Sequence, residues 1–144
     1  MRPIISLISG LLLGVSSSSV LAQALPQQPA APNSHVYFVS PQDGAVINGK
    51  VKVIFGLSGM GVAPAGVERP LTGHHHLLIN LDELPPLNSP LPATDNLVHF
   101  GNGQTETELE LPKGKHTLQL LLGDHFHIPH NPPVLSEKIT ITVK

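Results

Sequence analysis

The sequence predicts an all-β domain, a small antiparallel β-sandwich of immunoglobulin-like type with six to seven strands. Three observations support this fold class. Hydrophobic and polar residues alternate in four separate segments, no long stretch shows the 3.6-residue period of an amphipathic helix, and turn-forming Gly, Pro and Asn residues separate the segments. Strands with one polar face are typical of antiparallel sheets. A β-barrel is the alternative fold that the same pattern allows.

The predicted strands follow one another closely along the chain. In chain order they are residues 35–41, 50–57, 74–81, 105–111, 116–122 and 137–144. The second strand shows the alternation clearly, because Val51 and Val53 fall on one face and Lys50 and Lys52 on the other. Asp-Gly and Asn-Gly pairs mark turns between the first two strands, and a proline-rich loop at residues 82–95 separates the third strand from the fourth.

The first 24 residues have the features of a secretory signal peptide. A basic residue, Arg2, precedes an apolar run at residues 4–15, and Ala22-Gln23-Ala24 matches the small-x-small pattern of a signal-peptidase site. The apolar run is too short to cross a membrane comfortably. We therefore predict cleavage after residue 24, a periplasmic or secreted location, a flexible tail at residues 25–34 and one domain at residues 35–144.

The composition narrows the classes of partner. The formal net charge is −2 and no basic stripe is present, so neither nucleic acid nor an anionic membrane surface is expected to bind. The chain has no cysteine, so an exported domain has no disulfide and must depend on its core for stability. A metal site would have to use His, carboxylate, Met or backbone oxygen ligands. All nine histidines follow the predicted cleavage site.

Several sequence blocks, in a fixed order, resemble a family of exported bacterial proteins that carry the domain of unknown function 4399. The blocks include TGHHHLLIN, HFGNGQTE and LLGDHFHIPHNPP. The resemblance extends over nearly all of residues 40–144 and implies an exported, β-rich domain, but it implies no activity. Asn80 stands where the family pattern leads us to expect an aspartate, so we assign no carboxylate role at that position.

The first group of histidines lies in a predicted strand. Alternation places His74 and His76 on one face of this strand. His75 falls with Leu77 and Ile79 on the more apolar face, which we expect to meet the core. Two histidines separated by one residue on a strand point the same way and can bind one metal ion. The alternative is a polar strand end whose histidines hydrogen-bond to nearby backbone.

The second group, in LLGDHFHIPHNPP, leaves the sheet after Gly123. It holds three histidines within six residues, and its prolines restrict the loop, which lowers the entropy cost of ordering it around a ligand. The alternative is a structural loop in which Asp124 caps turn amides. His99 beside a glycine-rich turn and Met60, a soft thioether, are further candidates. The predicted metal ligands are therefore His74, His76, His99, His125, His127, His130 and Met60.

These features favour one function over two others. The favoured function is an exported, histidine-rich protein that binds copper or zinc as a carrier or buffer, with an envelope protein as a further partner and no membrane association after cleavage. The second is an envelope module whose histidines hydrogen-bond a non-metal partner. The third and least supported is a metal-dependent hydrolase, because no H-E-x-x-H motif is present and no catalytic residue can be assigned. Convergence of His74 or His76 with His99 and two of the three loop histidines would favour metal binding. Histidines scattered over both ends of the sandwich would favour the envelope module.

Overall fold

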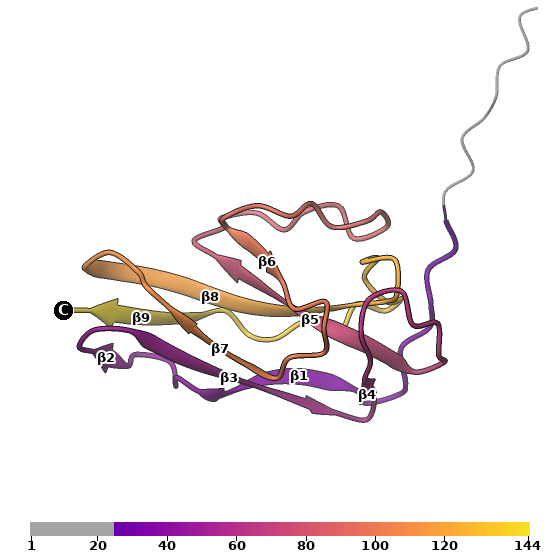
Figure 1. Cartoon of the computed structure of the whole chain (residues 1–144), viewed down its shortest axis with the longest axis horizontal. Coiled ribbons are helices and arrows are strands. Elements are labelled where there is room, and N and C mark those ends of the chain that lie inside the picture. The colour runs from indigo at the N-terminus through magenta and orange to yellow at the C-terminus, as the bar shows by residue number, and fades with distance from the viewer. Residues whose placement is uncertain (1–24) are drawn as a thin grey trace, which may run out of the picture.

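The computed structural model describes residues 25–144, so the predicted signal peptide lies outside the described residues. This part of the chain forms two packed sheets and no helix (Figure 1). The strands are β1 (His35–Ser40), β2 (Val46–Ile47), β3 (Val51–Ser58), β4 (Gly61–Val62), β5 (Thr72–Ile79), β6 (Leu97–His99), β7 (Glu106–Leu109), β8 (Gly114–Gly123) and β9 (Ile139–Val143). The predicted all-β, sandwich-like fold is confirmed, and its immunoglobulin-like type stays a prediction. Residues 25–144 contain no helix long and apolar enough to cross a membrane.

The two sheets differ in size. The smaller has the strand order β1-β3-β7, and the larger has the order β2-β9-β8-β5-β4, with β6 also paired to β5. Neighbours among the longer strands pair antiparallel, as the sequence predicts. The short strands β2, β4 and β6 are not among the predicted ones, because two or three residues carry no readable alternation. Of these, β2 and β4 pair parallel to a longer strand.

The main core lies between the sheets and is built from alternate residues of facing strands. β3 contributes Val51 and Val53 and β8 contributes Leu118 and Leu120, and all four are fully buried. These are inner-face residues in the alternation, so this part of the prediction is confirmed. Removal of such apolar surface from water is the main favourable contribution to folding. Because the chain has no cysteine, this core must hold the domain without a disulfide.

A second, smaller core lies on the outer face of the larger sheet. It contains Leu78, Leu91, Leu97 and Leu121. Figure 1 shows that the loop joining β5 to β6 lies on the side of the larger sheet away from β1 and β3. β5 is therefore buried on both faces. Histidines on the outer face of β5, which alternation alone would leave in solvent, are enclosed by loops.

Residues 25–34, the predicted tail, run beside the histidine-bearing loop that follows β8. Ala30 N donates a hydrogen bond to Asn131 O at 3.3 Å. Gln27 Nε2 donates to Leu87 O, in the loop between β5 and β6, at 2.6 Å. The segment thus contacts both loops that enclose the outer face of β5.

Candidate metal centre

Three imidazole nitrogens converge beside the outer face of β5. His74 Nε2 lies 2.9 Å and His76 Nε2 lies 3.3 Å from the same atom, His127 Nδ1. One ring nitrogen from each of these residues lies within 4.8 Å of the other two. A tetrahedral ion bound at about 2.0–2.1 Å from imidazole nitrogens separates its ligand atoms by about 3.3–3.4 Å. The group could therefore hold a metal ion.

Two glycines make room for histidine rings in the larger sheet, Gly123 for the converging ring of His76 and Gly73 for His130. A Cβ atom at Gly123 would lie 2.5 Å from His76 Cε1. A Cβ atom at Gly73 would lie 2.6 Å from Gly123 O and 2.9 Å from His130 Cε1. Neither position accepts a side chain without a shift of its neighbours, and glycine inside a strand often marks such a close approach. Gly73 and Gly123 were not among the predicted functional residues, although their place inside strands beside the histidines is a readable signal.

Asp124 shapes the turn that returns His127 to the sheet. Asp124 Oδ1 accepts hydrogen bonds from Phe126 N at 2.8 Å and from Ile128 N at 2.9 Å. His127 N donates to Asp124 O at 2.9 Å, and His127 has a φ of 63°, in the left-handed region that non-glycine residues rarely adopt. The capping of turn amides by Asp124, proposed above as an alternative to a metal site, therefore places one of the converging histidines.

His99 stands directly beside the three converging histidines. β6 pairs with β5 so that His99 lies opposite His76. The His99 ring centroid is 4.4 Å from that of His76 and 4.6 Å from that of His127. Its Nε2 donates to Pro92 O at 3.0 Å, which leaves Nδ1 as the nitrogen with a lone pair. This imidazole–carbonyl hydrogen bond is the usual way in which a ligating histidine is oriented.

Burial keeps the converging imidazoles neutral. It lowers the pKa of His74 to about 4 and of His76 to about 2, and the neighbouring histidines lower both pKa values further. Burial also lowers the pKa of His127, and His99 adds to that effect. Only a neutral imidazole has a free lone pair for a metal. At neutral pH all three nitrogens are therefore ready to bind an ion.

Three of the predicted ligands do not join this group. The chain turns after Gly123 instead of continuing as a strand, so His125 does not share a side with His127, and its ring packs on Phe126 with centroids 4.1 Å apart. His130 is fully buried, and its Nε2 donates to Thr72 O at 3.1 Å. Met60 packs against the main core. Of the seven predicted ligands, His74, His76 and His127 converge, and His99 lies adjacent to them.

His75 and His116 have other surroundings. His75 faces the main core, as predicted, and its ring centroid lies 5.0 Å from that of Phe55. Burial lowers the pKa of His75 to about 4. His116 Nε2 donates to Pro112 O at 2.7 Å, and Asn80 Nδ2 donates to His116 Nδ1 at 2.9 Å. The amide of Asn80 thus holds His116 at the end of β5 that lies away from the converging histidines.

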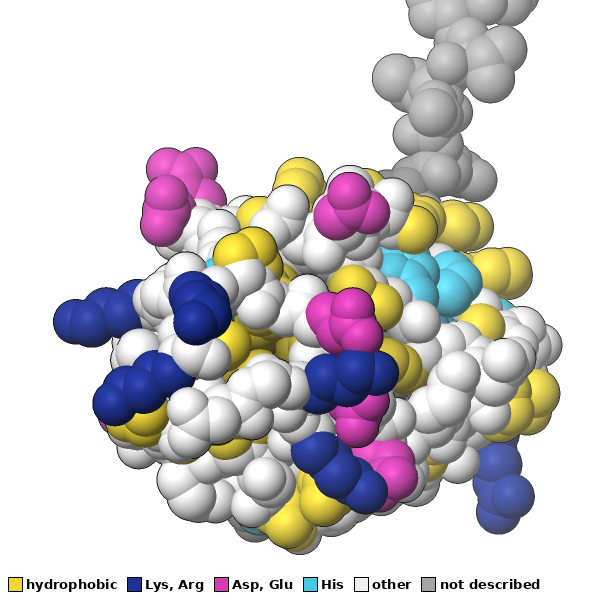
Figure 2. Space-filling view, turned by 60° about the vertical axis from the view of Figure 1, so that its left-hand side comes forward, with side chains coloured by type: hydrophobic (Ala, Val, Ile, Leu, Met, Phe, Trp, Pro, Cys, Tyr) yellow, Lys and Arg dark blue, Asp and Glu magenta, His cyan; other side chains and the backbone are white. Residues whose placement is uncertain are grey.

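The ion-paired side chains lie away from the metal centre. The ion pairs found in the described part of the chain join lysines and glutamates at β3 and β7, in the smaller sheet. Figure 2 shows histidine side chains at the surface, bordered mostly by hydrophobic and uncharged ones. His99 and His127 are half-buried, whereas His74 and His76 are buried. Solvent therefore reaches the centre from the side of the two loops.

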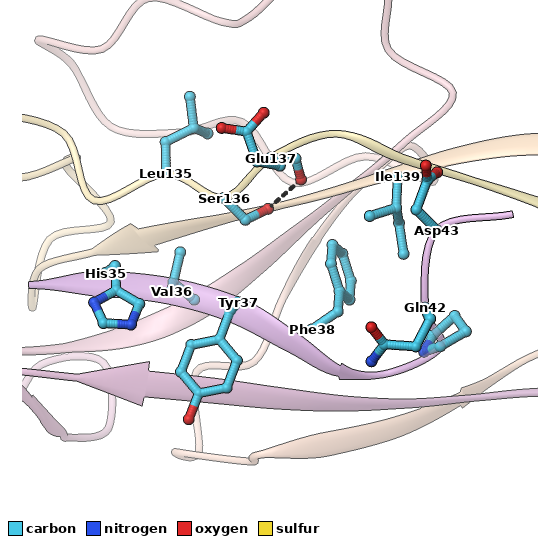
Figure 3. A pocket seen from close by; sticks show the side chains of 11 residues that line it. His35, Val36, Tyr37, Phe38, Gln42, Asp43, Leu135, Ser136, Glu137 and Ile139 are labelled. Atoms are coloured by element: carbon cyan, nitrogen blue, oxygen red, sulfur yellow. Dashed lines mark hydrogen bonds between the residues drawn. The ribbon is translucent and has the colours of Figure 1, made fainter. Parts of the chain in front are cut away.

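A separate groove of about 370 Å³ runs along β1 (Figure 3). Val36, Phe38 and Ile139 form part of its apolar lining. Ser136 Oγ, at its edge, donates to Glu137 O at 2.7 Å. None of the predicted metal ligands lines this groove, so it is distinct from the metal centre.

Residues 53–144 match the family described as Domain of unknown function (DUF4399). The chain belongs to this family. The match includes all the residues of the metal centre, and it confirms the resemblance seen in the sequence. The DUF4399 description assigns no activity, so a function has to be argued from the geometry. Searches of curated proteins and of solved structures found no match.

Proposed function

We propose that this DUF4399 protein binds a zinc or copper ion at His74, His76 and His127 and carries or buffers that ion outside the cytoplasm. The single observation that supports this most strongly is the convergence of three ring nitrogens from two distant segments. Neutral imidazole is a good ligand for zinc and copper. The compartment is inferred from the signal-peptide features of residues 1–24.

Hydrogen bonding alone leaves this arrangement incomplete. His127 Nδ1 faces both His74 Nε2 and His76 Nε2. A single proton can form a hydrogen bond between His127 Nδ1 and only one of these two nitrogens. The lone pair of the other nitrogen then has no hydrogen-bond donor. A metal ion accepts all three lone pairs at once. We therefore infer that a cation completes the contacts of the three nitrogens. The ring protons of His74 and His76 then lie on Nδ1 atoms that are buried without a hydrogen-bond partner in residues 25–144.

The site suits binding and release better than hydrolysis. Three ligands leave an open position, and the His99 ring lies next to the group. A hydrolase would also need a general base within reach of a metal-bound water. Asp124 is the nearest carboxylate along the loop, but it is buried and its Oδ1 already holds two backbone amides. We therefore propose a carrier or buffer.

Calorimetric titration of the metal-free protein with Zn²⁺ and Cu²⁺ tests this function. We expect one ion per chain, and we expect binding to be lost in the His74→Ala and His127→Ala variants. His125→Ala and His130→Ala are the controls and should bind like the unaltered protein, because neither ring belongs to the converging group. Binding no tighter than millimolar, or full binding after loss of His127, would overturn the proposal in favour of a non-metal envelope module.

A further inference from the structure

A buried carboxylate that forms no ion pair with a side chain of residues 25–144 lies in the loop that carries His127. Asp124 is 1% exposed. Its Oδ1 accepts two backbone hydrogen bonds, whereas its Oδ2 is buried and has no hydrogen-bond partner within residues 25–144. The ion pairs of this part of the chain are lysine–glutamate pairs elsewhere, so none of them includes Asp124. An unpaired buried charge is costly unless a cation compensates it.

Asp124 lies beside the metal centre, because its backbone oxygen accepts a hydrogen bond from His127 N at 2.9 Å. Asp124 does not belong to the group of converging ligand atoms, so it acts as a neighbouring charge and not as a direct ligand.

The donor atoms at the centre are all imidazole nitrogens. Met60, the only methionine after residue 24, lies against the main core, and the chain has no cysteine. Soft monovalent ions such as Cu⁺ prefer thiolate and thioether ligands, whereas imidazole suits Zn²⁺ and Cu²⁺. A divalent ion also gains twice the Coulomb energy of a monovalent one from the same carboxylate.

We propose, on the basis of the function given above, that the centre takes a divalent cation and that Asp124 supplies the charge that favours divalent over monovalent ions. This role is distinct from the capping of the turn. An asparagine at position 124 keeps an oxygen for the Phe126 and Ile128 amides but removes the charge. The two roles can therefore be separated in one variant.

The test compares Zn²⁺ with Ag⁺, a monovalent ion that stands for Cu⁺ without its oxidation. Affinities are measured by competition with chromophoric chelators for the unaltered protein, Asp124→Asn and Asp43→Asn. Asp43 is a matched control, since its Oδ1 accepts a hydrogen bond from Thr140 N at 2.7 Å, away from the metal centre. We expect Asp124→Asn to weaken Zn²⁺ binding on the order of 10- to 100-fold and Ag⁺ binding by about the square root of that factor. Asp43→Asn should change neither.

Equal losses for the two ions, or an unchanged Zn²⁺ affinity in Asp124→Asn, would overturn this inference and leave metal binding in place. Absence of binding by any ion to the unaltered protein would overturn the proposed function as well. Circular dichroism checks that Asp124→Asn folds. If Asp124→Asn does not fold, Zn²⁺ and Ag⁺ are allowed to compete for the unaltered protein. We expect equimolar Ag⁺ to leave the bound Zn²⁺ in place. Displacement of Zn²⁺ by Ag⁺ would contradict the inference.

Discussion

His74 Nε2 and His127 Nδ1 lie 2.9 Å apart, although 53 residues separate the two histidines in the chain. The first is fixed in a central strand and the second in a turn held by a buried aspartate. An ion bound between them links β5 to the loop after β8. Ligation should therefore stabilise the fold, because the unfolded chain does not hold these residues together.

The first prediction concerns thermal stability. Zn²⁺ at about 100 times its Kd should raise the free energy of unfolding by about 2.7 kcal/mol, since the ion binds the folded state alone. The measurement is the Tm by circular dichroism with and without Zn²⁺, followed by addition of a chelator. His127→Ala should show no increase in Tm. An equal increase in that variant would mean that the ion binds elsewhere.

The second prediction concerns the space at Gly123. Gly123→Ala should weaken Zn²⁺ binding, on the order of tenfold or more, because its Cβ would displace the His76 ring. Gly61→Ala is the matched control, since its Cβ would lie at an ordinary 3.4 Å from Thr72 Cγ2. Calorimetric titration measures both. If Gly123→Ala binds as tightly as Gly61→Ala, the ring of His76 is not held in the way described.

The third prediction ranks the histidines around the ion. His99→Ala should weaken Zn²⁺ binding by roughly tenfold, because His99 is adjacent to the three converging nitrogens. His76→Ala should abolish Zn²⁺ binding, because His76 contributes one of those nitrogens. His125→Ala should bind normally. Competition with a chromophoric chelator gives the three affinities. An effect of His125→Ala as large as that of His99→Ala would show that the loop binds the ion in another arrangement.

Much of the fold follows from two-residue alternation. Alternation in four segments, with turn residues between the segments, indicates the six longer strands, their inner faces and the opposite orientation of His75 relative to its two neighbours. It does not indicate β6, whose three residues place His99 opposite His76. Nor does it show that a loop covers the outer face of β5, because that burial comes from residues 80–96, far from the strand pattern. Alternation therefore predicts the faces but not the enclosure of the site.

The loop after β8 shows where sequence reasoning ends. If the strand pattern continued beyond Gly123, His125 and His127 would lie on the same face. The hydrogen bonds between Asp124 and backbone amides instead reverse the chain, so that only His127 reaches the site. The turn depends on a positive φ at His127, and the enrichment of histidine in that region does not by itself predict such a turn. The burial of His130 and the partial burial of Met60 depend on tertiary packing. Histidine enrichment thus predicts imidazole ligands, whereas the turn after β8 determines which histidine of the loop reaches the site.

The fourth prediction concerns pH and the buried His75. Its pKa is about 4 in the folded protein, below the usual 6.5, because burial penalises the charged ring. Between pH 6.5 and 4 the unfolded chain therefore binds more protons, so stability is complete above pH 6.5 and is lost as the pH falls. The loss attributable to His75 is on the order of 3 kcal/mol.

Urea unfolding of the metal-free protein across this pH range measures the effect. His75→Leu should show a smaller loss of stability on acidification than the unaltered protein. His35→Leu, at an exposed position of β1, is the matched histidine-to-leucine control. The same slope in His75→Leu and in the unaltered protein would contradict a neutral, buried His75.

The most direct test of a metal centre at His74, His76 and His127 is the visible absorption spectrum of the protein titrated with Co²⁺. The account predicts intense tetrahedral bands that saturate at one ion per chain, disappear on addition of one equivalent of Zn²⁺, and are absent in His74→Ala, His76→Ala and His127→Ala. Weak octahedral bands, or an unchanged tetrahedral spectrum after loss of any one of these three histidines, would contradict it.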